Sequence, residues 1–151
     1  MQIERIINVV GVFSLVAGLI FVGMELRQSQ RLALAAQQQE RTAITNDMVL
    51  GLTEANVDFQ SVYYERNFEY DLSTEKIAYR NFVHLTWFLY ENDYYQYTRR
   101  LMDESTWRAK LEGITLIYND CENRNIYTSR APVFSQGFRE IVQSLPDICG
   151  E

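Results

Sequence analysis

IINVVGVFSLVAGLIFVGM, residues 6–24, is a run of nineteen residues without a charged side chain. As an α-helix that rises about 1.5 Å per residue, this run would cross most of the ~30 Å hydrocarbon core of a bilayer. Charged residues stand on both sides of it, including Arg5 before the run and Arg27 after it. The run therefore predicts a transmembrane anchor at residues 1–25 of a single-pass membrane protein.

Two other interpretations of the run remain open. A cleavable signal peptide has a shorter apolar stretch and a small-residue cleavage site. The tripeptide Ala33-Leu34-Ala35 offers such a site, but only beyond Arg27 and Arg31, and a cleavage region is usually free of charge. The core helix of a soluble protein is apolar on every face only when it is fully buried. A retained membrane span fits the run better than either alternative.

The positively charged residues around the run predict its orientation. Arg27, Arg31 and Arg41 follow it, whereas Arg5 and the amino terminus precede it. Cytoplasmic flanks of membrane helices carry the excess of Lys and Arg, although the difference here is small. We therefore expect an inner-membrane protein whose C-terminal domain lies in the cytoplasm.

The cysteine and histidine content is low. Cys121 and Cys149 form no Cys-x-x-Cys pair, and His84 is the one histidine of the chain. These residues offer neither a usual zinc site nor a disulfide framework, which favours a reducing compartment. A di-iron bundle site needs a glutamate three residues before a histidine, and Asn81 occupies that position. We expect no metal and no cofactor.

Four small or polar residues form a stripe along one face of the predicted span: Asn8, Gly11, Ser14 and Gly18. Small side chains let helix backbones approach closely in lipid, and the Asn8 amide could form a hydrogen bond across such a contact. The stripe predicts association with a second copy of the chain or with another membrane protein. The alternative is that glycine is simply frequent in membrane helices.

The remaining chain predicts an all-α fold in two further parts. Residues 26–55 contain no proline and are rich in good helix formers, so the first helix should continue through them as a stalk. Residues 56–151 should form a small helical bundle. We expect a short helix over residues 59–70 and a non-helical polar break at residues 119–125. The expected N-caps of the three other helices are Ser73, Asp103 and Ser135.

Composition limits the partners. The chain has 47% hydrophobic and 13% aromatic residues, which is enough for a packed core. Its net charge is −6, and residues 56–151 contain ten Lys or Arg against fifteen Asp or Glu. Because phosphate binding needs a basic surface, nucleic acid is not an expected partner. Membrane lipid and other membrane-bound proteins are.

Several stretches together resemble a known group of sequences. They are ELRQSQRLA at residues 25–33, YENDYYQY at 90–97, DESTW at 103–107 and FSQGFREIV at 134–142. With the N-terminal span, they resemble small bacterial membrane-anchored helical proteins that have no assigned activity. The resemblance implies an anchor and a helical domain, but no mechanism. It also leads us to expect a glycine-containing turn where this chain has Arg99 and Arg100.

Three polar residues of the helix expected after Ser73 share one face. Arg80, His84 and Glu91 lie at positions i, i+4 and i+11. An Arg80–Glu91 pair beside a histidine that titrates near neutrality could line a site. The alternative is a structural polar network. The Arg80–His84 spacing also comes close to the R-x(4–6)-H motif of HEPN-type ribonucleases, but three residues separate the two instead of at least four.

The stretch FLYENDYYQY, residues 88–97, contains five aromatic rings around a carboxylate. Three interpretations are open, namely a helix that packs into the core, a protein interface, or a cage of rings for a cationic ligand. The residues of this stretch that could contribute to a ligand site with Arg80 and His84 are Glu91, Asn92, Tyr94 and Tyr95.

No sequence motif of a nucleotide-binding loop or of a hydrolase nucleophile occurs in the chain. We therefore expect a membrane-anchored interaction or assembly module, homo-oligomeric or an accessory subunit of a membrane complex, and no enzymatic activity. The alternative is a membrane-associated effector of a bacterial defence system, either HEPN-like or pore-forming.

Overall fold

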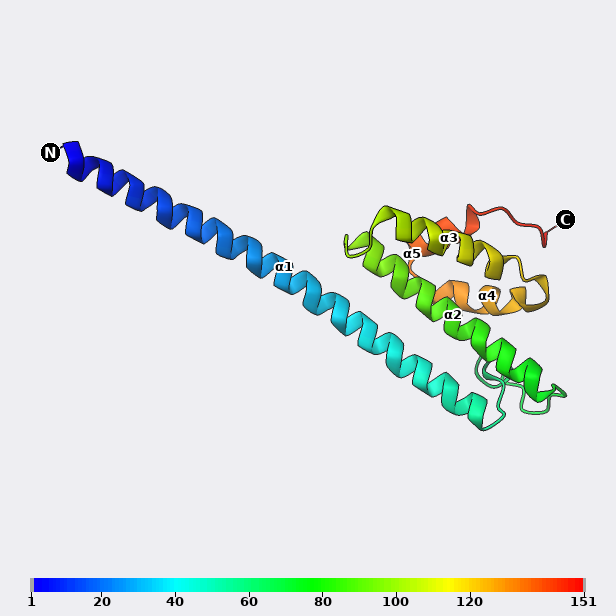
Figure 1. Cartoon of the computed structure of the whole chain (residues 1–151). Helices are drawn as coiled ribbons and strands as arrows, with labels where there is room; N and C mark the ends of the chain where they lie inside the picture. Colours follow the sequence, from blue (N-terminus) through cyan, green and yellow to red (C-terminus); the bar gives the residue numbers. More distant parts are fainter. Residues whose placement is uncertain (1, 151) are drawn as a thin grey trace. The chain divides into compact units, whose positions relative to one another are not determined.

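The structure is a computed structural model that describes residues 2–150. All regular secondary structure in that range is helical, which confirms the predicted all-α class (Figure 1). The helices are α1 (Gln2–Glu54), α2 (Thr74–Thr98), α3 (Glu104–Tyr118), α4 (Arg124–Arg130) and α5 (Gln136–Gln143). A π-helical turn (Gln60–Tyr64) and two 3-10 turns (Cys121–Asn123 and Ala131–Val133) complete the regular structure.

The chain divides into two compact units, Met1–Gln37 and Gln38–Glu151, here called the N-terminal unit and the C-terminal unit. The boundary falls inside the stalk predicted for residues 26–55. The last part of α1 is thus one of the packed helices of the C-terminal unit, where Val49 is fully buried. There the Asn81 amide donates a 2.9 Å hydrogen bond to the Thr53 hydroxyl.

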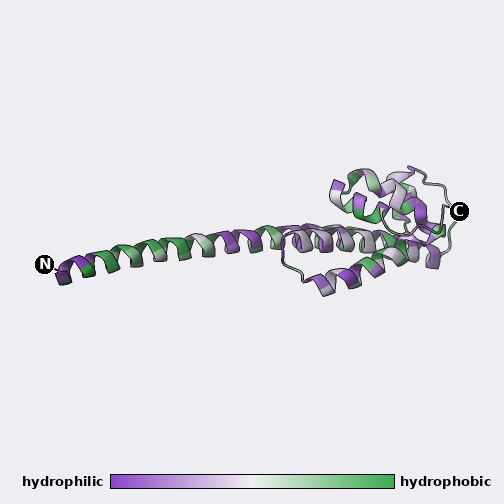
Figure 2. Cartoon of the chain, turned by 90° about the horizontal axis from the view of Figure 1, so that it is seen from above, coloured by the Kyte–Doolittle hydropathy of each residue, from purple (hydrophilic) through white to green (hydrophobic). Residues whose placement is uncertain are grey.

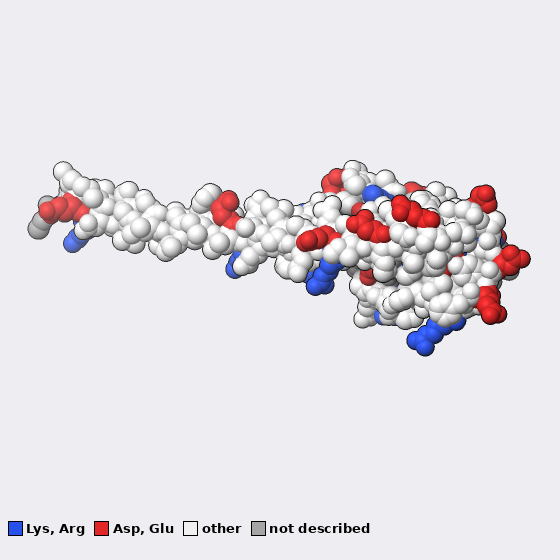
Figure 3. Space-filling model, turned by 90° about the horizontal axis from the view of Figure 1, so that it is seen from below, with Lys and Arg blue, Asp and Glu red and all other residues white. Residues whose placement is uncertain are grey.

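Residues 2–37 of the N-terminal unit are helical throughout, and the apolar side chains of residues 6–24 are exposed. Phe13 is 71% exposed and Leu19 is 73% exposed. Figure 2 shows the ribbon over most of the first part of α1 in the hydrophobic colour, and Figure 3 shows, on the face that it draws, charge only at the two ends of that stretch. It is the one helix among residues 2–150 that is long and apolar enough to cross a membrane.

The N-caps of α2 and α3 are those that the sequence predicts. The Ser73 hydroxyl accepts a hydrogen bond from the Lys76 backbone N–H, and the Asp103 carboxylate accepts one from the Thr106 N–H. Each cap satisfies an amide that has no partner within its own helix. Ser135 is the N-cap residue of α5, although its side chain makes no capping bond.

At its other end, α2 stops where we expected a glycine. Arg100 adopts a left-handed backbone with φ of 60°, a conformation that glycine adopts without strain. The Leu101 N–H donates a 3.0 Å hydrogen bond back to the Gln96 carbonyl, as in a glycine-type helix ending.

Helices α3 and α4 both pack on α2, and α5 packs on α3. Their shared core is aromatic, with Trp87 of α2, Trp107 of α3 and Phe138 of α5 almost completely buried. Two sequence predictions about the elements around this core are wrong.

The first error concerns the polar break expected at residues 119–125. That segment contains a 3-10 turn and the start of α4, which buries Ile126 and Tyr127. A helix of only seven residues is too short to show an apolar period in the sequence.

The second error concerns the helix expected over residues 59–70. Only the turn Gln60–Tyr64 forms. Side-chain hydrogen bonds hold the backbone there. The Asn81 amide oxygen accepts a hydrogen bond from the Phe59 N–H, and the Asp58 carboxylate accepts one from the Ser61 N–H. Arg66 then adopts a left-handed φ of 51°, which ends the helical path.

The cysteines require a further correction. Cys121 and Cys149, in which the sequence offered no disulfide framework, are joined by a disulfide, with their Cα atoms 5.3 Å apart. The two residues are 28 positions apart in sequence, and no local pattern connects them.

Candidate functional site

Arg80 takes part in a buried ion pair, but not with the residue that its spacing suggested. Its Nε donates a 2.9 Å hydrogen bond to Asp58 Oδ1, and its Nη2 donates a 3.2 Å bond to Asp58 Oδ2. Glu65 Oε1 lies 3.8 Å from Arg80 Nη2. The expected Arg80–Glu91 pair is not formed. Asp58 is fully buried and also holds the turn that follows it, so this pair fixes the loop after α1 onto α2.

His84 is fully buried one turn further along α2. Its ring stacks on Tyr64 with centroids 5.6 Å apart, and the Phe59 ring lies nearly perpendicular to it with centroids 4.7 Å apart. Neither ring nitrogen has a hydrogen-bond partner among the described residues.

This environment strongly disfavours the protonated imidazole. Burial, with smaller contributions from the Arg130 and Arg80 guanidinium groups, lowers the pKa of His84 to about 2. The expectation that this histidine titrates near neutrality is therefore wrong. A ribonuclease of the HEPN type needs a histidine that can reach its substrate, and this ring is enclosed on all sides.

Arg130 of α4 is a second buried cation, and we did not predict it. Its guanidinium carbon lies 3.6 Å from the Phe88 ring centroid and 5.1 Å from that of Phe134. Nε and Nη1 have no hydrogen-bond partner within residues 2–150. Burial lowers the pKa of Arg130 to about 10, so it remains charged at neutral pH. Only the position of α4 brings this residue to α2, and the sequence did not reveal that helix.

Glu91 lies on the face of α2 next to Phe88. Its carboxylate accepts a 3.2 Å hydrogen bond from the Ser135 N–H at the start of α5. Burial raises the pKa of Glu91, while the Ser135 N–H and the charge of Arg130 oppose that rise.

Glu91 also lines two adjoining hollows on the C-terminal unit. One, of about 450 Å³, is lined by Gln38, Glu91, Tyr94, Tyr95, Thr98 and Ser135. The smaller one is lined by Gln38, Arg41, Thr42, Thr45, Phe88 and Glu91. Together they form an open, mixed-polarity groove between residues 38–45 of α1 and residues 88–98 of α2. A groove of this kind can accept side chains of a partner.

The aromatic stretch of residues 88–97 packs mainly into the core. Tyr94 contacts Trp107 and Phe138, with ring centroids 5.9 and 5.6 Å apart, and its hydroxyl lies against Gly137. Tyr97 stacks on Trp107 at 4.9 Å.

The two other candidate residues of this stretch have near neighbours along α2. Arg99 covers the Tyr95 ring at 5.0 Å, and the buried Asn92 accepts a hydrogen bond from Gln96. Tyr94 and Tyr95 line the hollow at Glu91, but Tyr94 also packs on Trp107 and Phe138, and Arg99 covers the Tyr95 ring.

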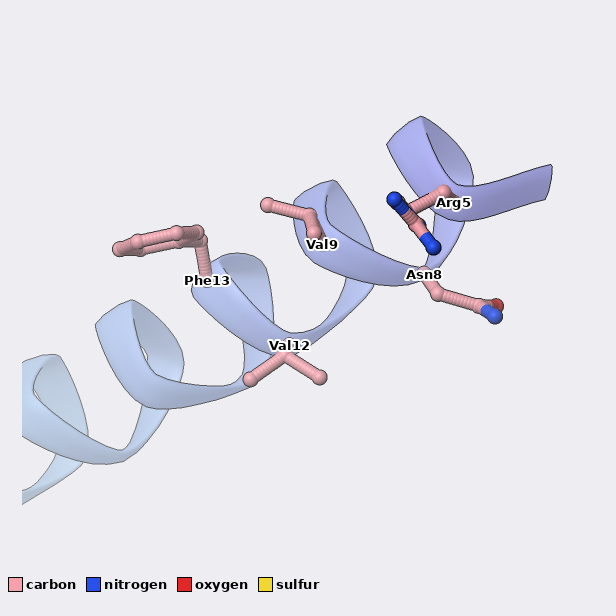
Figure 4. Close-up of a pocket in the computed structure, with 5 residues that line it drawn as sticks. All are labelled: Arg5, Asn8, Val9, Val12 and Phe13. Carbon is pink, nitrogen blue, oxygen red and sulfur yellow. The ribbon is translucent and has the colours of Figure 1, made fainter. Parts of the chain in front are cut away.

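The small-residue stripe of the N-terminal unit has no covering element. A Cβ atom added at Gly11 or Gly18 would meet nothing within 4 Å. Next to the stripe, Asn8 lines a shallow hollow with Arg5, Val9, Val12 and Phe13 (Figure 4). All five residues belong to α1, so the hollow is a gap between side chains of one helix and not an enclosed cavity.

No known protein family, curated protein or solved structure matches the chain. Among the described residues, no group of three or more metal-ligating side chains comes together. The buried polar residues of the C-terminal unit include Arg80, His84 and Arg130, and an open groove lies at Glu91.

Proposed function

We propose that the chain is a single-pass membrane protein whose C-terminal unit serves as a helical interaction or assembly module and catalyses no reaction. The observation that supports this proposal most directly is the exposure of residues 6–24. They carry no charge and are exposed along their whole length. So large an exposed apolar surface is unfavourable in water, whereas the hydrocarbon core of a bilayer solvates it well.

The polar residues of the C-terminal unit favour binding over catalysis. His84 is neutral and enclosed, and Arg80 is held by Asp58. General acid–base catalysis needs a group that titrates near the working pH and can reach the substrate. The open groove at Glu91, by contrast, has the mixed polarity of a surface that contacts another protein.

Self-association through the stripe at Asn8, Gly11, Ser14 and Gly18 is part of the proposal. Glycine at two of these positions leaves the α1 backbone open to a close helix contact in the bilayer. The contact could join two copies of the chain, or this chain and another membrane subunit.

Two features bear on the side of the membrane on which the C-terminal unit lies. Arg27, Arg31 and Arg41 after the span outnumber Arg5 and the amino terminus before it, and they favour the cytoplasm by a small margin. The Cys121–Cys149 disulfide favours a compartment that is not reducing.

Membrane extraction tests the anchor. The full-length chain should remain in the membrane pellet after alkaline carbonate treatment and should be released by detergent. Replacement of Val12 and Leu19 by lysine places two charges inside the span, at a cost of about 2.5–3.5 kcal/mol each near its centre, and should release the chain. Recovery of the unaltered full-length chain in the soluble fraction would contradict the proposal.

A second experiment tests the stripe. Replacing Gly11 and Gly18 together with isoleucine should shift the particle mass in mild detergent toward the monomer, because the added side chains keep the backbones apart. The matched control replaces Ala17 and Gly23, which lie outside the stripe on its two sides, with isoleucine. Equal mass distributions for the two double variants would mean that the stripe is not the contact.

A further inference from the structure

The last residues of the C-terminal unit are fastened to the end of α3 by contacts that do not involve sulfur. The Asn119 amide donates a 3.0 Å hydrogen bond to the Pro146 carbonyl, and its side-chain oxygen accepts a 3.0 Å bond from the Ile148 N–H. One side chain thus holds the backbone on both sides of Asp147. These bonds bring Cys149 to the start of the 3-10 turn at Cys121.

Asp147 strengthens the attachment. Its carboxylate accepts hydrogen bonds from two guanidinium nitrogens of Arg124, from the Tyr118 hydroxyl and from the Cys149 N–H. The Arg124 guanidinium in turn lies 3.5 Å from the centroid of the Tyr118 ring. The backbone bond from Cys149 and the bond from Arg124 lower the pKa of Asp147, so its charge persists into mildly acidic solution. None of these contacts uses a sulfur atom, so we expect them to bring the two cysteines together in the reduced chain as well.

The two sulfur-bearing residues lie at the surface. Cys121 is exposed and Cys149 is partly exposed, and both stand at the end of the bundle. A protein oxidant can reach the two thiols, and a cytosolic thiol could equally reach and reduce the disulfide between them. The chain has no other cysteine, so no competing pair exists within it.

We infer that Cys121 and Cys149 are the substrate of a thiol–disulfide oxidant, and that the C-terminal unit lies on the oxidising side of the membrane. The thiolate of one cysteine attacks the disulfide of the oxidant and forms a mixed disulfide. The thiolate of the second displaces the oxidant, which leaves as a dithiol. Two electrons and two protons pass from the cysteine pair to the oxidant, and one sulfur–sulfur bond replaces another.

This placement reverses the orientation expected from the flanking cations. That expectation depends on a difference of one or two positive charges between the flanks, which is a weak signal. An accessible disulfide in the cytoplasm would be exposed to the reducing glutathione and thioredoxin systems, whereas it persists outside that compartment.

Thiol trapping in intact cells tests the inference. Cells that express the full-length chain are quenched in acid, and free thiols are then labelled with a maleimide that carries a polyethylene glycol chain. The chain should gain no added mass without reductant and two increments after reduction. The double variant Cys121→Ser/Cys149→Ser should gain none in either case. Two increments without reductant, or a disulfide-linked dimer in place of an internal bond, would overturn the inference.

Reporter fusions test the side of the membrane separately. Alkaline phosphatase fused to the C-terminus should be active, because it needs its own disulfides, and a cytoplasmic fluorescent reporter at the same position should be dark. The reverse pattern would refute the placement. The inference uses the proposed anchor only to define a membrane side. A disulfide-bonded chain in the soluble fraction would therefore disprove the anchor and still support the oxidant.

A third variant tests whether the fold directs the pairing. Asn119→Ala removes two hydrogen bonds to the attached segment and should slow re-formation of the disulfide from the reduced folded chain by about tenfold. Thr128→Ala, which removes a hydroxyl bonded only to the local helix carbonyl of Arg124, is the matched control. Equal rates for the two variants would mean that Asn119 does not position Cys149.

Discussion

Replacing His84 with phenylalanine should remove a pH dependence of stability that the wild-type chain shows between pH 7 and pH 5. The ring is enclosed by Phe59 and Tyr64, and its two nitrogens have no partner among the described residues. Phenylalanine keeps an aromatic ring in that space and cannot take up a proton. The comparison therefore isolates protonation of the imidazole from packing.

The magnitude follows from the two pKa values of His84. The pKa is about 2 in the folded chain, whereas an unfolded histidine has a pKa of about 6.5. Because the folded pKa is the lower one, the contribution to stability is complete above pH 6.5 and is lost as the pH falls toward 2. At pH 5 the unfolded chain is almost fully protonated at this residue and the folded chain is not. The free energy of unfolding should drop by about 2 kcal/mol between pH 7 and pH 5.

Urea unfolding of the full chain in detergent micelles can measure this change. The fluorescence of Trp87 and Trp107 reports on the core, since both indole rings are buried. Glu91 acts in the opposite direction, because burial raises its pKa, and its contribution is lost as the pH rises. That contribution is common to both chains and cancels in the comparison. If the free energy of unfolding fell equally between pH 7 and pH 5 in the wild type and in His84→Phe, the conclusion that His84 is enclosed and neutral would be refuted.

Three further substitutions test other contacts in the C-terminal unit. Asp58→Asn removes the nearer of the two carboxylates beside the buried Arg80 and should lower the free energy of unfolding by about 3 kcal/mol, as measured by urea unfolding. Gly137→Ala places a methyl group against the Tyr94 hydroxyl and should cost about 1–3 kcal/mol, and Tyr94→Phe in the same chain should restore most of the loss. Arg100→Gly relieves a left-handed backbone and should raise the midpoint of thermal unfolding, with a gain of about 1 kcal/mol. These assignments would be contradicted if Tyr94→Phe did not restore the stability of the Gly137→Ala chain. They would also be contradicted if the Arg100→Gly chain were less stable than the wild type.

The sequence predicted those parts of the fold that local rules determine. The caps at Ser73 and Asp103 depend on one side chain and the amide three residues later, so they can be recognised without any tertiary information. The long helix that includes residues 6–24 is equally local, because its length and composition suffice. The aromatic stretch at 88–97 was correctly considered as a core element, although the sequence alone left two other interpretations open.

The partners of the buried polar residues could not be predicted, because they come from distant parts of the chain. Asp58 reaches Arg80 across 22 positions, and it does so from a turn whose helical pattern was misread. Arg130 lies 42 positions beyond Phe88, on a helix too short to be recognised. The spacing along α2 suggested an Arg80–Glu91 pair because a spacing pattern relates only residues of the same helix. A buried charge takes its partner from any element that packs against it.

The disulfide illustrates the same limit and has the largest consequence for function. Two cysteines 28 positions apart carry no spacing signal, and their approach depends on how α3 ends and how the residues after α5 return to it. Once Asn119 and Asp147 are seen to hold that return, the pairing follows from the fold. It also changes the weight of the orientation argument. A difference of one or two cations beside the span is an average tendency of membrane proteins, whereas a disulfide between the chain's only two cysteines is a property of this molecule. Because the specific observation outweighs the average one, we infer that the C-terminal unit, with its groove at Glu91, lies where it would meet partners outside the cytoplasm.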